Sequence, residues 1–100
     1  LKNAQFIGGN PEENNIYGYI SWTPEGEGII AMRNPNNEET SLTLTFNKLM
    51  GTPQSLKGAK CFNVYCKSMS ETDETYDYNS KMDLTMKPFE VMIFKIAKER

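Results

Sequence analysis

Four carboxylates gather in one polar stretch of the chain, and paired carboxylates are the groups that hydrolyse glycosidic bonds. Glu71, Asp73, Glu74 and Asp77 lie within SMSETDETYDYNS, residues 68–80. A glycosidase needs two such groups about 5 to 9.5 Å apart across a shaped cleft, with the pKa of one raised by burial. A polar loop supplies neither condition, and the spacing differs from that of calcium-binding loops. We therefore expect a solvated acidic loop, with a weak calcium site as the alternative.

Histidine is missing from the sequence. Its absence removes Ser-His-Asp and Cys-His catalytic arrangements and every zinc site that needs an imidazole ligand. On one strand, Cys61 and Cys66 would lie about 16 Å apart on opposite faces, far beyond disulfide reach. We expect two free thiols that pack as small apolar side chains. The sequence predicts neither a cofactor nor a metal ion.

Aromatic side chains are better candidates for a binding site, because sugar rings stack on flat, partly exposed aromatic faces. Tyr17 and Tyr19 share one face of an expected strand, and Trp22 falls on the other face. We take these three residues as candidates for contact with a carbohydrate or a neighbouring domain. Packing inside the core is the competing interpretation. Tyrosines that face another domain would form an apolar patch that is exposed when the domain stands alone.

Two further features have structural explanations. Arg33 ends an apolar run, and we expect it to bond an acidic group or a backbone carbonyl of the following corner. Gly26 and Gly28 precede a strand rather than a helix, so the context does not fit a phosphate-binding loop.

Strand patterns recur along the chain, and these elements must position the candidate residues. Alternation of apolar and polar residues dominates, and long 3.6-residue periods are missing. The expected strands are residues 1–7, 16–22, 28–34, 40–46, 60–67, 81–86 and 90–97. Residues 28–34 and 90–97 are apolar on both faces, which is typical of central strands. The sequence thus predicts an all-β fold, an antiparallel β-sandwich of six to eight strands that forms a single domain over residues 1–100.

The connections between these strands carry distinct signals. TPEGE at residues 23–27 predicts a hairpin turn, and PNNEE at 35–39 predicts a second one that leads directly to the next strand. Residues 47–59 contain two glycines and a proline, so we expect a crossing between sheets with at most one helical turn at 47–50. Residues 68–80 are expected to form a long loop.

Charge and composition argue against several classes of partner. The 100 residues include 11 basic and 13 acidic side chains without a basic cluster, which does not fit a nucleic-acid-binding protein. No apolar run approaches the roughly 18 to 20 residues of a membrane helix. Because the sequence opens at Leu1 without a methionine, we expect a segment of a longer chain.

Four short segments together resemble a known kind of domain. They are GGNP at 8–11, YGYISW at 17–22, GIIAMRNP at 28–35 and KPFEVMIFK at 87–95. These segments resemble the C-terminal β-sandwich that follows the catalytic barrel in bacterial glycoside hydrolases of the α-galactosidase-like and amylase-like kind. The resemblance implies a non-catalytic accessory domain whose partner is that barrel, in a periplasmic or secreted parent enzyme. Its motifs are structural, so it transfers no catalytic residue.

Two other functions stay open at this stage. A carbohydrate-binding module could use Tyr17, Tyr19 or Trp22 as its platform. An immunoglobulin-like protein-interaction domain would share the sandwich, although the Cys-Trp-Cys framework of true immunoglobulin domains is missing. An independent enzyme is the least favoured class.

Overall fold

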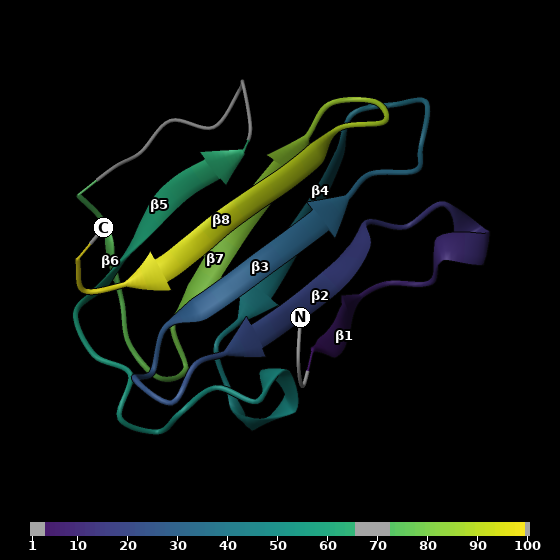
Figure 1. The fold of residues 1–100 in the computed structure, drawn as a ribbon. Helices are drawn as coiled ribbons and strands as arrows, with labels where there is room; N and C mark the ends of the chain where they lie inside the picture. Colours follow the sequence, from purple (N-terminus) through teal and green to yellow (C-terminus); the bar gives the residue numbers. More distant parts are fainter. Residues whose placement is uncertain (1–3, 66–72, 100) are drawn as a thin grey trace.

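Eight strands and two short 3₁₀ turns make up the regular structure in the computed structural model, which describes residues 4–65 and 73–99 (Figure 1). The strands are β1 (Gln5–Gly8), β2 (Tyr17–Trp22), β3 (Gly28–Arg33), β4 (Thr40–Thr45), β5 (Ala59–Tyr65), β6 (Thr75–Tyr76), β7 (Lys81–Met86) and β8 (Val91–Ala97). The turns are η1 (Pro11–Glu13) and η2 (Lys48–Met50). Within these described ranges, no helix is long and apolar enough to cross a membrane.

The strands form two antiparallel sheets that pack face to face. The larger sheet has the order β1-β2-β3-β8-β5-β6, and the smaller sheet consists of β4 and β7. Figure 1 shows the six-stranded sheet in front and the β4-β7 pair behind it. The predicted all-β antiparallel sandwich is confirmed, and β3 and β8 lie at the centre of the larger sheet as expected.

Alternation along the strands separates the core from the surface. In β7, every second residue is buried and its neighbours are exposed, which is the period of a strand with one face on the core. Each large apolar side chain that is fully buried in this way contributes about 1.5 to 3 kcal/mol. The largest fully buried apolar side chains are Ile16, Ile20, Ile30, Met32, Phe46, Met86, Phe94 and Ile96.

The expectation of a hairpin turn at residues 35–39 is wrong. Strand β3 pairs with β2 on one edge and with β8 on the other, so no edge is free for β4. Residues 35–39 instead carry the chain to the second sheet, where β4 pairs with β7. The later crossing is confirmed, because residues 47–59 connect β4 to β5 in the larger sheet and contain η2.

Asn34 fixes the first of these crossings. Its side chain is fully buried, with 0% of its surface exposed. The Nδ2 group donates to the carbonyl oxygens of Glu38 at 3.0 Å, Met86 at 3.1 Å and Lys87 at 3.0 Å, and Oδ1 accepts from the backbone N–H of Asn36 at 3.0 Å. Buried polar groups are tolerated only when they are satisfied in this way. One side chain therefore ties the exit of β3 to the turn between β7 and β8.

The expectation of a loop throughout residues 68–80 is wrong at β6. This short strand pairs with the start of β5 and places Tyr76 in the core, edge-on to Phe46 at 5.5 Å between ring centroids. Residues 66–72, which include Cys66 and Glu71, lie outside the described part of the chain. Cys61 is half-buried and packs against the core, as predicted.

Tyr76 gives the fold a predicted pH dependence. Burial, followed by the nearby Glu74 carboxylate, raises the pKa of Tyr76 from 10.0 to about 12. The unfolded chain loses this proton near pH 10 while the folded chain keeps it. This contribution to stability is therefore complete below pH 10 and is lost as the pH rises towards 12. Urea unfolding between pH 8 and 12 should show a smaller decline for Tyr76→Phe than for the unaltered chain, and equal declines would contradict the prediction.

Candidate functional site

The structure separates the three aromatic residues that the sequence singles out. Tyr17 and Tyr19 lie on the outer face of the six-stranded sheet, the side that faces away from β4 and β7. Trp22 lies on the opposite side, where its Nε1 donates to the carbonyl oxygen of Met50 at 3.0 Å and its ring meets Phe46 edge-on at 6.4 Å. The tyrosines share one surface, and Trp22 packs between the strands and η2.

Phe6 joins the two tyrosines and is a residue that the sequence analysis missed. Its ring stacks on Tyr17 with centroids 6.2 Å apart and meets Tyr19 edge-on at 5.7 Å. The Arg33 guanidinium donates to the Tyr17 hydroxyl at 3.4 Å. Its partner is therefore a tyrosine, where we expected an acidic group or a backbone carbonyl. These four residues come from β1, β2 and β3, and only the pairing of those strands brings them together.

Strand register defines the rest of the outer face, because partners across antiparallel strands point to the same side of a sheet. One row crosses five strands from β1 to β5 and is composed entirely of apolar and aromatic residues. Its members are Phe6, Tyr19, Ala31, Ile93 and Tyr65. Two flanking rows consist of Tyr17, Arg33 and Val91, and of Ser21, Ile29, Lys95 and Phe62.

A groove of about 210 Å³ lies on this face and is lined almost wholly by apolar atoms. Its lining residues are Tyr17, Gly18, Tyr19, Ala31, Met32, Arg33 and Val91. Only the tyrosine hydroxyls and the Arg33 guanidinium offer side-chain hydrogen-bonding groups there. A sugar ring needs both a flat aromatic face and several polar partners for its hydroxyls. The groove therefore suits an apolar contact better than a hydroxyl-rich ligand.

The outer face of the smaller sheet has the opposite character. Ser41 and Thr85 share a hydrogen bond of 3.1 Å, and the Thr43 hydroxyl donates to Asp83 at 2.7 Å. Lys81 continues this polar row beside Thr45. Water hydrates such a surface well. The outer face of the smaller sheet is therefore polar, whereas that of the larger sheet is apolar.

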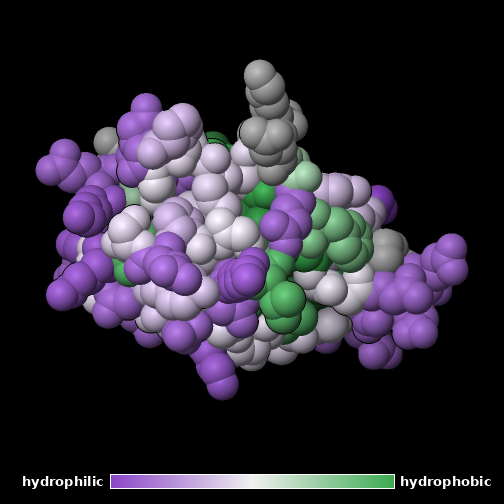
Figure 2. Space-filling view, turned by 90° about the horizontal axis from the view of Figure 1, so that it is seen from below, coloured by the Kyte–Doolittle hydropathy of each residue, from purple (hydrophilic) through white to green (hydrophobic). Residues whose placement is uncertain are grey.

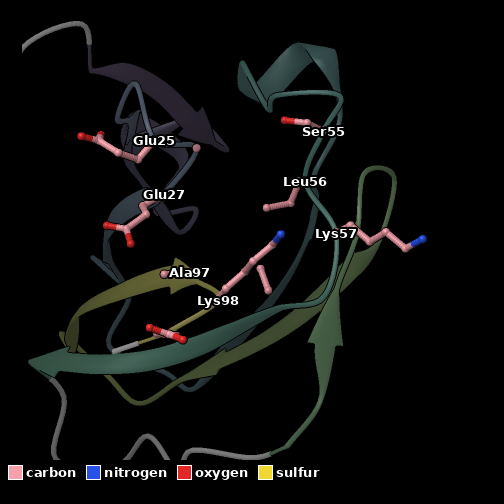
Figure 3. A pocket seen from close by; sticks show the side chains of 10 residues that line it. Glu25, Glu27, Ser55, Leu56, Lys57, Ala97 and Lys98 are labelled. Atoms are coloured by element: carbon pink, nitrogen blue, oxygen red, sulfur yellow. The ribbon is translucent and has the colours of Figure 1, made fainter.

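A second hollow, of about 430 Å³, lies among charged residues near the end of β8 (Figure 3). Glu25 and Glu27 lie on one wall, and the segment that carries Ser55, Leu56 and Lys57 forms the other. Figure 3 shows the Lys57 side chain pointing away from the hollow. The Glu25 side chain is exposed, whereas a catalytic acid lies in a closed cleft that shields it from water. We assign no chemistry to this hollow.

The acidic residues of the 68–80 stretch also form no site within the described chain. Asp77 accepts a hydrogen bond from the backbone N–H of Gly58 at 2.7 Å, and Asp73 lies 3.9 Å from the Lys60 amine. Among the residues that the structure describes, no group of three or more carboxylates and cysteines could hold a metal ion. The hydrogen bond to Gly58 therefore gives Asp77 a structural role.

A third groove, of about 450 Å³, runs between β1 and β4 beside η2. Figure 2 shows the molecule from below, the side where η2 lies in Figure 1, and hydrophobic residues gather there in one patch among hydrophilic ones. Leu49 of η2 is the most exposed large apolar residue of the described chain. Phe6 also lines this groove, but Thr43, Thr45 and Asn47 contribute polar atoms, so the groove is of mixed character.

Comparison with known proteins identifies the fold. No protein-family model matches this chain, and no curated protein matches it. One solved structure with a similar fold belongs to a Bacillus halodurans protein described as a "putative alpha-N-acetylgalactosaminidase". The two structures superimpose with a TM-score of 0.65 over 97% of this chain, at 16% sequence identity.

The matched region covers 21% of the Bacillus halodurans chain, so this chain spans about a fifth of that protein's length. At this identity the likeness establishes the fold alone. The same fold therefore forms one part of that Bacillus halodurans chain, which is consistent with the resemblance seen in the sequence. That this chain is a domain of such an enzyme stays a prediction, as do the roles of Tyr17, Tyr19 and Trp22.

Proposed function

We propose that this chain is a non-catalytic accessory domain of a glycoside hydrolase, which packs on the catalytic domain of the same polypeptide and stabilises it. The observation that carries the proposal is the apolar outer face of the six-stranded sheet, centred on the row from Phe6 to Tyr65. Large exposed apolar surfaces on folded domains mark interaction sites. The fold match to a fifth of a longer glycosidase chain is consistent with such a role.

The proposal predicts that removal of this domain destabilises the rest of the enzyme. In the complete encoded polypeptide, deletion of residues 1–100 should lower the midpoint of thermal unfolding of the catalytic domain by roughly 5 °C, because a few kcal/mol of interface energy are lost. Turnover per folded molecule should change little, since the catalytic groups belong to the other domain. Calorimetry and glycosidase assays on the two proteins measure these quantities.

Two results would refute the proposal. One is a truncated enzyme that matches the complete polypeptide in unfolding midpoint and solubility. The other is a gene that encodes no hydrolase domain beside this chain. Either result would refute the accessory role and would leave the assignment of the fold unchanged.

The exposed rings of Phe6 and Tyr19, together with the half-buried ring of Tyr17, favour carbohydrate binding as a second candidate function. Sugar stacking on these rings would change tyrosine fluorescence and the nearby aromatic NMR signals. Titration of the chain with oligosaccharides should leave these signals unchanged if the accessory role is correct. Saturable binding that disappears in Tyr19→Ser would support the carbohydrate-binding function instead.

A further inference from the structure

We infer that the outer face of the six-stranded sheet is the surface that docks the catalytic domain, and that the docked surface is apolar and carries carboxylates. This inference rests on the proposed function and adds to it the face used and the chemistry of the partner.

Exposure of large apolar side chains is concentrated on this face. Among the described residues seven large hydrophobic side chains are exposed, and four of them belong to the outer face by register. They are Phe6 at 46%, Tyr19 at 46%, Val91 at 41% and Tyr65 at 59%. Isolated exposed apolar residues are ordinary on protein surfaces, but a contiguous set across several strands marks an interface.

The size of the face fits a contact between domains. Five strands spaced about 4.8 Å apart, each about six residues long, span roughly 24 by 20 Å, or about 500 Å² on one partner. Interfaces between domains of one chain bury about 600 to 1,500 Å² in total, counted over both partners. The outer face alone therefore supplies enough area for a stable interdomain contact.

Charge identifies the chemistry of the partner. The charged residues that register places on the outer face are Arg33, Lys95 and Lys60, and all three are cations. Asp73 approaches Lys60 at the margin of this face. A second copy of this chain would bring cations against cations, which disfavours self-association. A surface with carboxylates opposite Arg33 and Lys95 would complement both charges.

The packing of the rings favours a protein over a sugar as the occupant. Phe6 already covers part of Tyr17 and meets Tyr19 edge-on, so the three rings pack on one another instead of standing as separate flat platforms. Protein interfaces have cores rich in aromatic residues, with arginine as a frequent partner. The row around Tyr19 and Ala31 is of this kind.

Crosslinking in the complete polypeptide tests the docking face directly. A carbodiimide joins a lysine amine to a carboxylate only when the two are in contact, so Lys95 should crosslink to aspartates or glutamates of the catalytic domain. Lys81, on the polar face of the smaller sheet, is the matched control and should form at least about tenfold fewer such links. Peptide mass spectrometry identifies both partners of each link.

Charge reversal gives a second, independent test in the complete polypeptide. Arg33→Glu and Lys95→Glu should each weaken docking about tenfold or more, because like charges would then face each other. If the two domains of the unaltered polypeptide unfold in one thermal transition, each variant should show two separate unfolding transitions. Lys81→Glu makes the same change of charge on the other face and should leave the transition intact.

The possible outcomes distinguish this inference from the proposed function. Links from Lys81 in place of Lys95 would overturn the docking face but leave the accessory role standing. A catalytic domain that is indifferent to removal of residues 1–100 would overturn the accessory role itself. Protection of Lys95 by an oligosaccharide, with no interdomain links, would overturn the inference in favour of a sugar site.

Discussion

Replacement of Asn34 by leucine is expected to lower the free energy of unfolding by about 4 kcal/mol. Leucine has a similar volume but cannot donate to the three carbonyl groups that Nδ2 serves, nor accept from the backbone N–H of Asn36. Those groups would stay buried without partners, and each such group costs roughly 1 to 3 kcal/mol. Urea unfolding followed by the fluorescence of Trp22 measures the loss.

Two further variants show whether the loss comes from these hydrogen bonds. Asn37→Leu places the same residue at an exposed position of the same connection and should change stability by less than about 0.5 kcal/mol. Asn34→Asp keeps an acceptor for Asn36 but loses the donors, so it should also be strongly destabilised. An Asn34→Leu chain that unfolds at the same urea concentration as the unaltered chain would contradict this account.

Local pattern was sufficient to predict seven of the eight strands and the class of fold. The alternation in residues 40–46 and 81–86 depends only on neighbouring residues and on one buried face, so it can be identified without a structure. The apolar character of both faces of β3 likewise marks it as central, and its pairing with β2 and β8 confirms this. A tight turn at 23–27 joins β2 to β3, as predicted.

Pairing between distant strands could not be predicted in the same way. The turn residues at 35–39 are compatible with a hairpin, and only the occupation of both β3 edges excludes one. For the same reason, the full set of residues on the outer face could not be predicted from the sequence. Phe6 and Tyr65 come from opposite parts of the sequence and enter one row because β8 lies between β3 and β5. Register is a property of the whole sheet, whereas periodicity is a property of a segment.

The short strand β6 escaped prediction for a different reason. Its surroundings in the sequence are polar and acidic, and two residues are too few to show a period. The usable signal was aromatic character in a polar stretch, at Tyr76 and Tyr78, and it is the ring of Tyr76 that packs on Phe46. Burial of that one ring, rather than a repeating pattern, positions the segment against β5.

Replacement of Gly18 by alanine is expected to have the second large effect, because it disturbs both the pairing of β2 with β3 and the outer face. A Cβ atom at this position would overlap the carbonyl oxygen of Ala31 and lie 2.7 Å from Met32 Sδ. The oxygen belongs to the backbone of β3, so it cannot move without displacing the strand. We expect a loss of about 3 kcal/mol or more in the free energy of unfolding, measured by urea unfolding.

Gly26→Ala is the matched control, since a Cβ there meets nothing within 4 Å. Its backbone φ of +85° alone should cost about 1 kcal/mol. Because Gly18 lies between Tyr17 and Tyr19, displacement of β2 should also reduce the crosslinks from Lys95 in the complete polypeptide, which Gly26→Ala should preserve. Equal stability of the two variants would show that β2 and β3 can separate slightly at a cost of only about 1 kcal/mol. The close approach at Gly18 would then contribute little to the shape of the docking face.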